Sequence, residues 1–407
     1  MNTAAGSRVT MFRRAVPGVV LLFALAHLAH HLVTALPVPL LPFIRDEFNL
    51  DYTRAALVVS AFSIPYGFSQ LPGGWLADRF GARRLILVGI SGVALAGLGI
   101  GLSTSYTLLL VALFLMGALG GGYHPSAPAA ISRVTPPARR GAALGVHMIG
   151  GSVSYFVAPL AAGGIAALWG WRVPFIGLAV PAILFGVFFY FLLGRREREA
   201  TRVEPTAAHT PAPTEVDSVG SVDWLRMITF LTLTSVSAAV VLAVISFIPL
   251  YLVDVFGYAE HNAAAAIALF YSTGIWASVA GGYVSDRIGR VRVVVLFGLL
   301  AGPALALLNV SGSSFGIMVL LLCLGVGLYA RAPASESYVV GHAPRHKRST
   351  VLGFYYFGSM EGSGVLAPVV GWLIDSYGFD TAFLASGAAL FLVASVCTVL
   401  LRGWRAD

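Results

Sequence analysis

Gly73-Gly74-Trp75-Leu76-Ala77-Asp78-Arg79-Phe80-Gly81-Ala82-Arg83-Arg84 is the first of two copies of a short pattern in this chain. The second copy begins 208 positions later and reads Gly281-Gly282-Tyr283-Val284-Ser285-Asp286-Arg287-Ile288-Gly289-Arg290-Val291-Arg292. The Gly-Gly pair, the Asp-Arg pair and the next Gly keep the same offset, and each copy separates two long apolar runs. Such a repeat predicts a chain built from two related halves.

The composition predicts a membrane protein. Of the 407 residues 57% are hydrophobic and only 11% are charged, and the mean hydropathy is +0.83. A soluble chain would carry about 25% charged residues. Runs of roughly 20 apolar residues can cross a bilayer as helices. Twelve such runs occur, at about 15–43, 54–77, 84–103, 106–132, 140–168, 172–194, 224–253, 260–284, 291–310, 314–341, 350–375 and 379–402.

The basic residues indicate the topology. In a twelve-span arrangement 22 of the 26 fall on one side, and only Arg45, Arg54 and Arg172 lie near the other. Positive charge accumulates on the cytoplasmic side of membrane proteins. We therefore expect a multi-pass protein of the cytoplasmic (inner) membrane with both termini in the cytoplasm. The net charge of +8 is then explained by the basic residues on the cytoplasmic side of the membrane. We therefore expect no nucleic-acid partner.

The division into halves predicts three parts. Residues 1–194 would form an N-terminal six-helix half, residues 195–223 a flexible cytoplasmic linker, and residues 224–407 a C-terminal six-helix half. The linker contains Pro205, Pro211 and Pro213 among Ala, Thr and mixed charges, a composition typical of inter-domain segments. Gly117 and Pro125 reappear as Gly325 and Pro333 at the 208-residue offset.

Several function classes are disfavoured. Cys323 and Cys397 both lie in apolar runs, and no CxxC motif occurs. The single lysine, Lys347, follows a histidine, so no GxxxxGK[ST] phosphate loop is present. No Ser/His/Asp arrangement or metal-ligand spacing is visible. We expect a monomeric non-enzyme without a cofactor, with the lipid bilayer and a small-molecule substrate as partners.

These residues resemble the major facilitator superfamily. The Gly74…Asp78-Arg79…Gly81…Arg83 loop is similar to the family's signature between its second and third spans, and Gly282…Asp286-Arg287…Gly289 is similar to the signature's second-half copy. Ala82 departs from the pattern, where the family often has a basic residue. The resemblance implies twelve transmembrane helices, an all-α fold and transport by alternating access. Asp and Arg near helix ends would then form a conformational latch between the halves.

Two narrower resemblances suggest export. Gly145, Ser154, Ala158-Pro159 and Gly163-Gly164 are similar to the glycine-rich fifth span of drug/proton antiporters. His27-x-x-His30 and Tyr123-His124-Pro125 are similar to fosmidomycin-resistance-type exporters. The arginine that such antiporters carry in the fourth span is absent, and its counterpart at the 208-residue offset from Tyr123 is Arg331 in the tenth span.

Ionisable residues at membrane depth are costly and are functional candidates. His27, His30 and His31 fall on one helical face, because their spacing is i, i+3 and i+4. With His124 and His147 they could relay protons or simply bond neighbouring helices. A metal site is an alternative, but no Asp or Glu accompanies these histidines and we expect no metal.

The second half holds Arg331, Glu336 and Glu361. Arg331 and Glu336 lie about 140° apart around a regular helix, so Glu361 is the candidate partner of Arg331. Alternatively, Arg331 binds an anionic substrate directly, or a permanent Arg–Glu pair fixes the helices. Further candidate cavity residues are Tyr66, Gln70, Tyr155, Tyr329 and Tyr355.

The sequence therefore predicts a secondary transporter that exports a small organic compound, an anionic one if Arg331 binds it, in exchange for protons. An organic-anion uptake porter, working by symport or exchange, is the alternative that Arg331 favours. A non-transporting receptor on the same fold is a further alternative.

Overall fold

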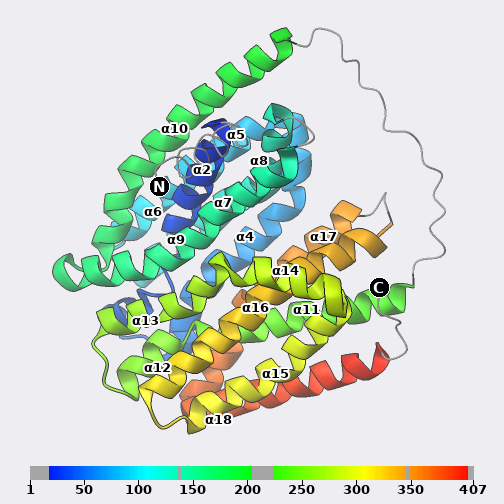
Figure 1. Cartoon of the computed structure of the whole chain (residues 1–407). Helices are drawn as coiled ribbons and strands as arrows, with labels where there is room; N and C mark the ends of the chain where they lie inside the picture. The colour runs from blue at the N-terminus through cyan, green and yellow to red at the C-terminus, as the bar shows by residue number, and fades with distance from the viewer. Residues whose placement is uncertain (1–17, 136–138, 204–222, 345–347, 402–407) are drawn as a thin grey trace, which may run out of the picture.

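The computed structural model describes residues 18–135, 139–203, 223–344 and 348–401. The basic residues expected before the first span, the linker beyond residue 203 and the last six residues lie outside this part. All regular structure within it is helical, as the sequence predicts. The two halves occupy the upper and lower parts of Figure 1.

The described residues of the first half form ten helical elements. They are α2 (Gly18–Thr34), α3 (Leu41–Phe48), α4 (Tyr52–Phe80), α5 (Ala82–Leu87), the π-helix η1 (Val88–Gly92), α6 (Val93–Gly101), α7 (Tyr106–Gly120), α8 (Tyr123–Val134), α9 (Arg140–Trp169) and α10 (Arg172–Val203). Helix α10 continues to Val203, so the segment expected as a linker from residue 195 is helical at its start.

The second half repeats this arrangement. It contains α11 (Trp224–Ile245), α12 (Ile248–Asp254), α13 (Glu260–Ser272), the 3₁₀ turn η3 (Thr273–Ile275), α14 (Ala277–Ile288), α15 (Arg290–Val310), α16 (Ser314–His342), α17 (Arg348–Tyr356), the π-helix η5 (Phe357–Glu361) and α18 (Gly362–Leu400).

Backbone conformation carries the same 208-residue repeat. Among the described residues, six of the seven positive φ angles form three matched pairs: Asn49 (48°) with Gly257 (67°), Gly81 (88°) with Gly289 (98°), and Gly170 (87°) with Gly378 (80°). Glycine adopts this conformation without steric cost, whereas most residues do not. The glycines of the two basic loops are therefore required by the turn between successive helices. Gly378 likewise interrupts α18.

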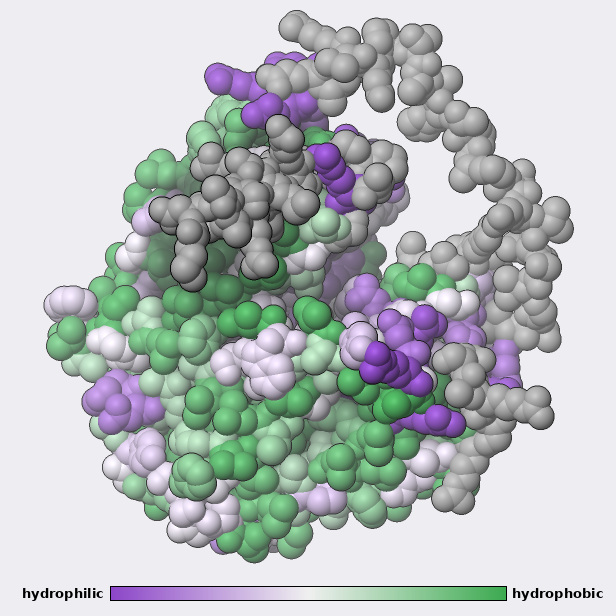
Figure 2. All heavy atoms as spheres, in the orientation of Figure 1, coloured by the Kyte–Doolittle hydropathy of each residue, from purple (hydrophilic) through white to green (hydrophobic). Residues whose placement is uncertain are grey.

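The apolar helices agree with a membrane-spanning bundle. In the described part of the chain, eight helices are long and apolar enough to cross a membrane, or nine if the bent pair Glu260–Ile275 and Ala277–Ile288 counts as one span. The twelve expected runs exceed this number because Thr350–Leu400 counts once despite the break at Gly378. In addition, α2 has only 17 residues and α4 includes polar residues. Figure 2 shows hydrophobic residues over the broad face of both halves.

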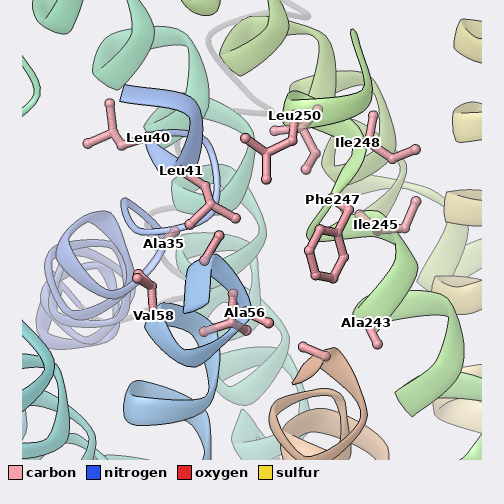
Figure 3. Packing of buried hydrophobic residues seen from close by; sticks show 14 of the residues in the cluster. Ala35, Leu40, Leu41, Ala56, Val58, Ala243, Ile245, Phe247, Ile248 and Leu250 are labelled. Carbon is pink, nitrogen blue, oxygen red and sulfur yellow. The ribbon is translucent and has the colours of Figure 1, made fainter. Parts of the chain in front are cut away.

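The two halves share a core at one end only. The largest buried cluster combines Ala35, Leu41 and Val58 of the first half with Phe247 and Leu250 of the second (Figure 3). Toward the other end the core divides. One cluster, which includes Phe23, Tyr123 and Phe189, belongs to the first half, and another, which includes Phe230, Tyr338 and Val351, belongs to the second. The halves thus share one hydrophobic core at one end of the molecule, and each half has its own core at the other end.

A repeated glycine contact holds neighbouring helices close within each half. A Cβ on Gly117 of α7 would lie 2.2 Å from the carbonyl oxygen of Phe62, and a Cβ on Gly325 of α16 would lie 2.5 Å from that of Phe270. Both glycines and both phenylalanines are related by the 208-residue offset. Small residues at such crossings let membrane helices pack backbone to backbone.

We expect Gly117→Ala and Gly325→Ala each to destabilise the protein by about 1–3 kcal/mol, because the added methyl group meets backbone that cannot rotate away. The midpoint of thermal unfolding in detergent measures the effect. Gly164→Ala is the matched control, since nothing lies within 4 Å of its Cβ position. Equal midpoints for Gly117→Ala and the wild type would contradict this account of the crossing.

Candidate functional site

Five histidines from three helices gather in the first half. His27, His30 and His31 lie on α2, His124 on α8 and His147 on α9. The ring centroids of His27 and His147 are 4.2 Å apart, those of His27 and His31 are 4.8 Å apart, and those of His31 and His124 are 5.2 Å apart. The expected shared face of α2 therefore points to α8 and α9. His124 is half-buried and the other four are buried.

Three of these histidines are held by bonds to neighbouring helices, and one of the three, His27, bonds the backbone of His147 on α9. His30 Nδ1 lies 2.6 Å from the carbonyl oxygen of Gly89, and its Nε2 lies 2.8 Å from the Tyr66 hydroxyl. A carbonyl only accepts, so Nδ1 donates; in a neutral ring Nε2 then accepts from Tyr66. His147 Nδ1 donates to the carbonyl oxygen of Phe23 over 3.0 Å. The three rings connect α2 to η1, α4 and α9.

Arg331 is buried in the second half, and among the described residues no carboxylate pairs with it. Its side chain donates to the Thr234 hydroxyl, which in turn is hydrogen-bonded to Ser335 over 2.8 Å. It also interacts with the Tyr355 hydroxyl, and its guanidinium carbon lies 5.6 Å from the centroid of the Phe297 ring. Arg331 is 3% exposed, and its Nε atom has no hydrogen-bond partner in the described part of the chain. This cation is therefore solvated by neutral groups alone.

Glu361 and Glu336 occupy different environments, and the described residues contain no ion pair between either and Arg331. Glu361 is buried and is hydrogen-bonded to Ser63 of α4. Its side chain packs on Gly67, where a Cβ would lie 2.9 Å from the Glu361 Cβ. Glu361 thus reaches across to the first half instead of pairing with Arg331. Glu336 is exposed and is hydrogen-bonded to Tyr356.

Of the expected aromatic and amide positions, Tyr66, Tyr155 and Tyr355 lie near these groups. Tyr66 and Tyr155 of the first half are both close enough to the Glu361 carboxyl group to interact with it electrostatically. The Tyr155 ring also lies 5.3 Å from that of Tyr271 in the second half. Tyr329 packs beside Gly274 of η3, and Tyr355 contacts Arg331. Gln70 is half-buried with an unpartnered Nε2 atom.

In the part that the structure describes, no ion pair joins the two repeated basic loops. Asp78, Arg79, Asp286 and Arg287 are exposed, and Arg79 and Arg287 lie over aromatic rings of their own helices. The Arg83 guanidinium lies 4.3 Å from the Tyr190 ring centroid. Gly74, Gly81, Gly282 and Gly289 belong to the same loops. The latch between halves that the sequence predicts stays a prediction, since these exposed side chains show no ion pair across the halves among the described residues.

Sequence analysis missed a polar clasp at the opposite end, formed by Arg45, Tyr52, Thr53, Asp254 and Asp375. Arg45 and the Tyr52 hydroxyl both bond the Asp254 carboxylate. The Asp375 carboxylate accepts from the backbone amides of Tyr52 (2.9 Å) and Thr53 (2.8 Å) and from the Thr53 hydroxyl. These amides open helix α4, where a negative charge is favoured by the helix dipole. The clasp joins the halves where they share a core.

Part of this clasp could have been found from the repeat. Asp254 stands 208 positions after Asp46, which also bonds Arg45. Asp375 has no such counterpart, because position 167 is an alanine. Beside the clasp, Arg172 and Trp171 bond Glu47, and the Arg172 guanidinium holds the pKa of that carboxyl group below its usual value.

We expect Asp375→Ala to open the clasp end at least tenfold more often. Each charge-assisted hydrogen bond contributes about 1.5–3 kcal/mol, and a loss of about 1.4 kcal/mol is a tenfold change in population. The measurement is the maleimide labelling rate of Ala56→Cys, a buried joint-core position, in a background with Cys323 and Cys397 replaced by serine. Asp380→Ala, at an exposed position of the same helix, is the control. Labelling rates that Asp375→Ala leaves unchanged would show that the clasp does not hold this state.

The chain matches the Major Facilitator Superfamily over residues 23–278 and 230–405. It belongs to this superfamily, and it is a multi-pass membrane transporter, not an enzyme. The curated relatives include the protein described as "Probable sulfoacetate transporter SauU" from Cupriavidus necator, 26% identical over 86% of this chain and 85% of the relative. The cis,cis-muconate transport protein of Acinetobacter baylyi is 24% identical over 89% of both chains. The hexuronate transporter of Bacillus subtilis is 24% identical over 87% of both.

Solved structures agree on the fold. A bacterial homolog of the human lysosomal transporter Spinster, crystallised in an inward-facing and occupied conformation, aligns with a TM-score of 0.75 at 18% identity, over 95% of this chain and 96% of that one. A POT family transporter in complex with a thioalcohol-conjugated peptide aligns with a TM-score of 0.76 at 15% identity, over 94% and 96% of the two chains.

Proposed function

We propose that this superfamily member carries a small organic anion across the membrane together with protons, and that Arg331 binds the anionic group. One observation carries the proposal: Arg331 is buried and charged but has only neutral neighbours among the described residues. A buried charge is stable when it is paired. An anionic substrate would supply the missing partner during each transport cycle.

The relatives support the chemical class. Three relatives that match over more than four fifths of both chains are named for sulfoacetate, cis,cis-muconate and hexuronate, all of which are small organic anions. A guanidinium presents a planar fork of donors that fits carboxylate and similar oxyanions in bidentate fashion. The unpartnered Nε of Arg331 belongs to that fork, and the adjacent Thr234 and Tyr355 hydroxyls could contribute further hydrogen bonds.

Glu361 is the group that we propose to carry the proton. It is buried at the contact between α4 and η5, and no cation pairs with it in the part of the chain that the structure describes. A carboxyl group in such surroundings can take up a proton and become neutral when it leaves water. Because Arg331 and Glu361 do not pair, substrate and proton can be bound at the same time, which suits symport.

Alternating access follows from the two ends of the molecule. By the excess of positive charge in the sequence, the Asp78 and Asp286 loops would lie in the cytoplasm. Toward that end each half has its own hydrophobic core. The clasp would then close the outer end in the conformation described here. Transport would proceed by rocking of the halves about the central residues, with the clasp opening as the basic loops engage.

Proton-coupled export is the second candidate, and helix α9 favours it. Of the glycine-rich positions that resemble those of antiporters, Gly163 packs against α13 of the other half, since a Cβ there would lie 2.8 Å from the carbonyl oxygen of His261. Ser154 and Ala158 are buried as well. Such close packing beside the contact between halves fits a helix that takes part in the rocking motion.

Purified protein in liposomes distinguishes the two directions regardless of its orientation in the bilayer. Radiolabelled sulfoacetate, cis,cis-muconate and a hexuronate would be tested under an imposed pH gradient. Symport accumulates the anion on the alkaline side, because protons and anion move together, and we expect this result. Accumulation on the acidic side would assign antiport and export. Absence of gradient-driven movement for every anion, with transport of neutral or cationic compounds instead, would overturn the proposal.

A further inference from the structure

The five histidines divide into two groups by the bonds they make. His30 uses both ring nitrogens, one on the Gly89 carbonyl and one on the Tyr66 hydroxyl. His147 is anchored by its Nδ1 on Phe23. The other three, His27, His31 and His124, each offer a ring nitrogen, and these three nitrogens lie within 4.8 Å of one another.

His27 has the clearest geometry. Its Nδ1 lies 2.9 Å from the carbonyl oxygen of His147 and must donate to it. In the neutral ring Nε2 therefore carries a lone pair, and this atom is buried without a hydrogen-bond partner among the described residues. The whole residue is only 2% exposed. A buried acceptor without a partner costs free energy. A bound group that accepts the Nε2 lone pair would remove this cost.

His31 repeats the arrangement. Its Nδ1 lies 3.1 Å from the Thr34 hydroxyl, which can accept from it and leave Nε2 free. A histidine whose Nδ1–H donates to a carbonyl or hydroxyl is oriented as metal-binding histidines are, because the second bond fixes the tautomer and the ring. His124 completes the triangle from α8, with its ring centroid 5.4 Å from that of His27.

We propose that His27, His31 and His124 form a binding site for a divalent transition-metal ion of the Zn²⁺ class. Three neutral imidazoles are a recurring ligand set for Zn²⁺, with bonds of about 2.0–2.1 Å and a fourth position left for water or another ligand. Mg²⁺ and Ca²⁺ prefer oxygen ligands and do not suit this site. The sequence predicts no metal because no carboxylate accompanies these histidines; a His₃ set needs none. The site is independent of the proposed substrate.

Metal binding by the full chain tests the assignment. The protein would be purified with a tag that contains no histidine, treated with a chelator, and titrated with Zn²⁺ by calorimetry and with Co²⁺ by visible absorption. We expect one ion per chain and a tetrahedral Co²⁺ spectrum that Zn²⁺ abolishes. His27→Gln, His31→Gln and His124→Gln should each weaken binding at least tenfold.

Two control variants separate this site from other histidines. His261→Gln removes an exposed imidazole at the start of α13. His147→Gln removes a neighbouring ring but keeps the backbone carbonyl that accepts from His27. Both should bind Zn²⁺ with wild-type stoichiometry. Thermal unfolding checks that each variant is folded, and only proteins with the intact triad should be stabilised by Zn²⁺. No stoichiometric binding by the folded wild type, or binding that survives in the folded triad variants, would overturn the proposal.

Discussion

Arg331→Ala is expected to abolish measurable transport of the organic anion and to weaken its binding about tenfold to a hundredfold. The estimate follows from the loss of charge-assisted hydrogen bonds, each worth about 1.5–3 kcal/mol. Without the guanidinium, the anion would have to leave water for a site that offers only hydroxyl groups, chiefly those of Thr234 and Tyr355. Uptake into liposomes and anion-induced thermal stabilisation measure the two effects.

Stability separates this role from a structural one. If Arg331 serves only to hold helices together, its removal should lower the unfolding temperature. If Arg331 is instead a buried cation that is unpaired until the substrate binds, its removal relieves a desolvation penalty. The unfolding temperature should then stay the same or rise. Arg331→Lys keeps the charge but not the planar fork, and we expect intermediate binding. Wild-type affinity in Arg331→Ala would contradict anion binding at this residue.

The fold could be predicted because its decisive signals are local and occur twice. Gly81 and Gly289 both have a positive φ angle, so the repeated sequence motif predicts a repeated turn. The apolar runs likewise follow from composition. The break at Gly378 could be anticipated from Gly170, its counterpart at the 208-residue offset. The resemblance to the superfamily, read from the same loops, is confirmed.

The site was harder to predict because it depends on contacts between distant segments. Arg331 and Glu361 look like partners by charge, but Glu361 lies against Gly67 and Ser63 of the first half. Asp375 bonds amides more than 300 positions away. Nothing in the local sequence distinguishes Asp375 from other aspartates near the ends of apolar runs. Similarly, the spacing of His27 and His31 predicts a shared face, but only the packing of α8 on α2 brings His124 to them.

Glu361→Gln is expected to abolish accumulation driven by a pH gradient while leaving exchange of substrate for substrate intact. Glutamine keeps the size and hydrogen-bonding capacity of the side chain beside Gly67 and Ser63 but cannot take up or release a proton. One pH unit is worth about 1.36 kcal/mol per proton, so coupled symport of one proton can sustain about a tenfold anion gradient. In Glu361→Gln that ratio should fall to about one.

Exchange of labelled for unlabelled anion in the absence of a gradient shows whether the variant still binds substrate and changes conformation. Glu336→Gln is the control, because Glu336 is an exposed carboxyl group on α16, and it should accumulate substrate like the wild type. Loss of exchange together with accumulation in Glu361→Gln would assign Glu361 to the contact between halves instead of to the proton. Accumulation that persists in Glu361→Gln would move the proton to another group, and the histidines that adjoin Tyr66 would be the next to test.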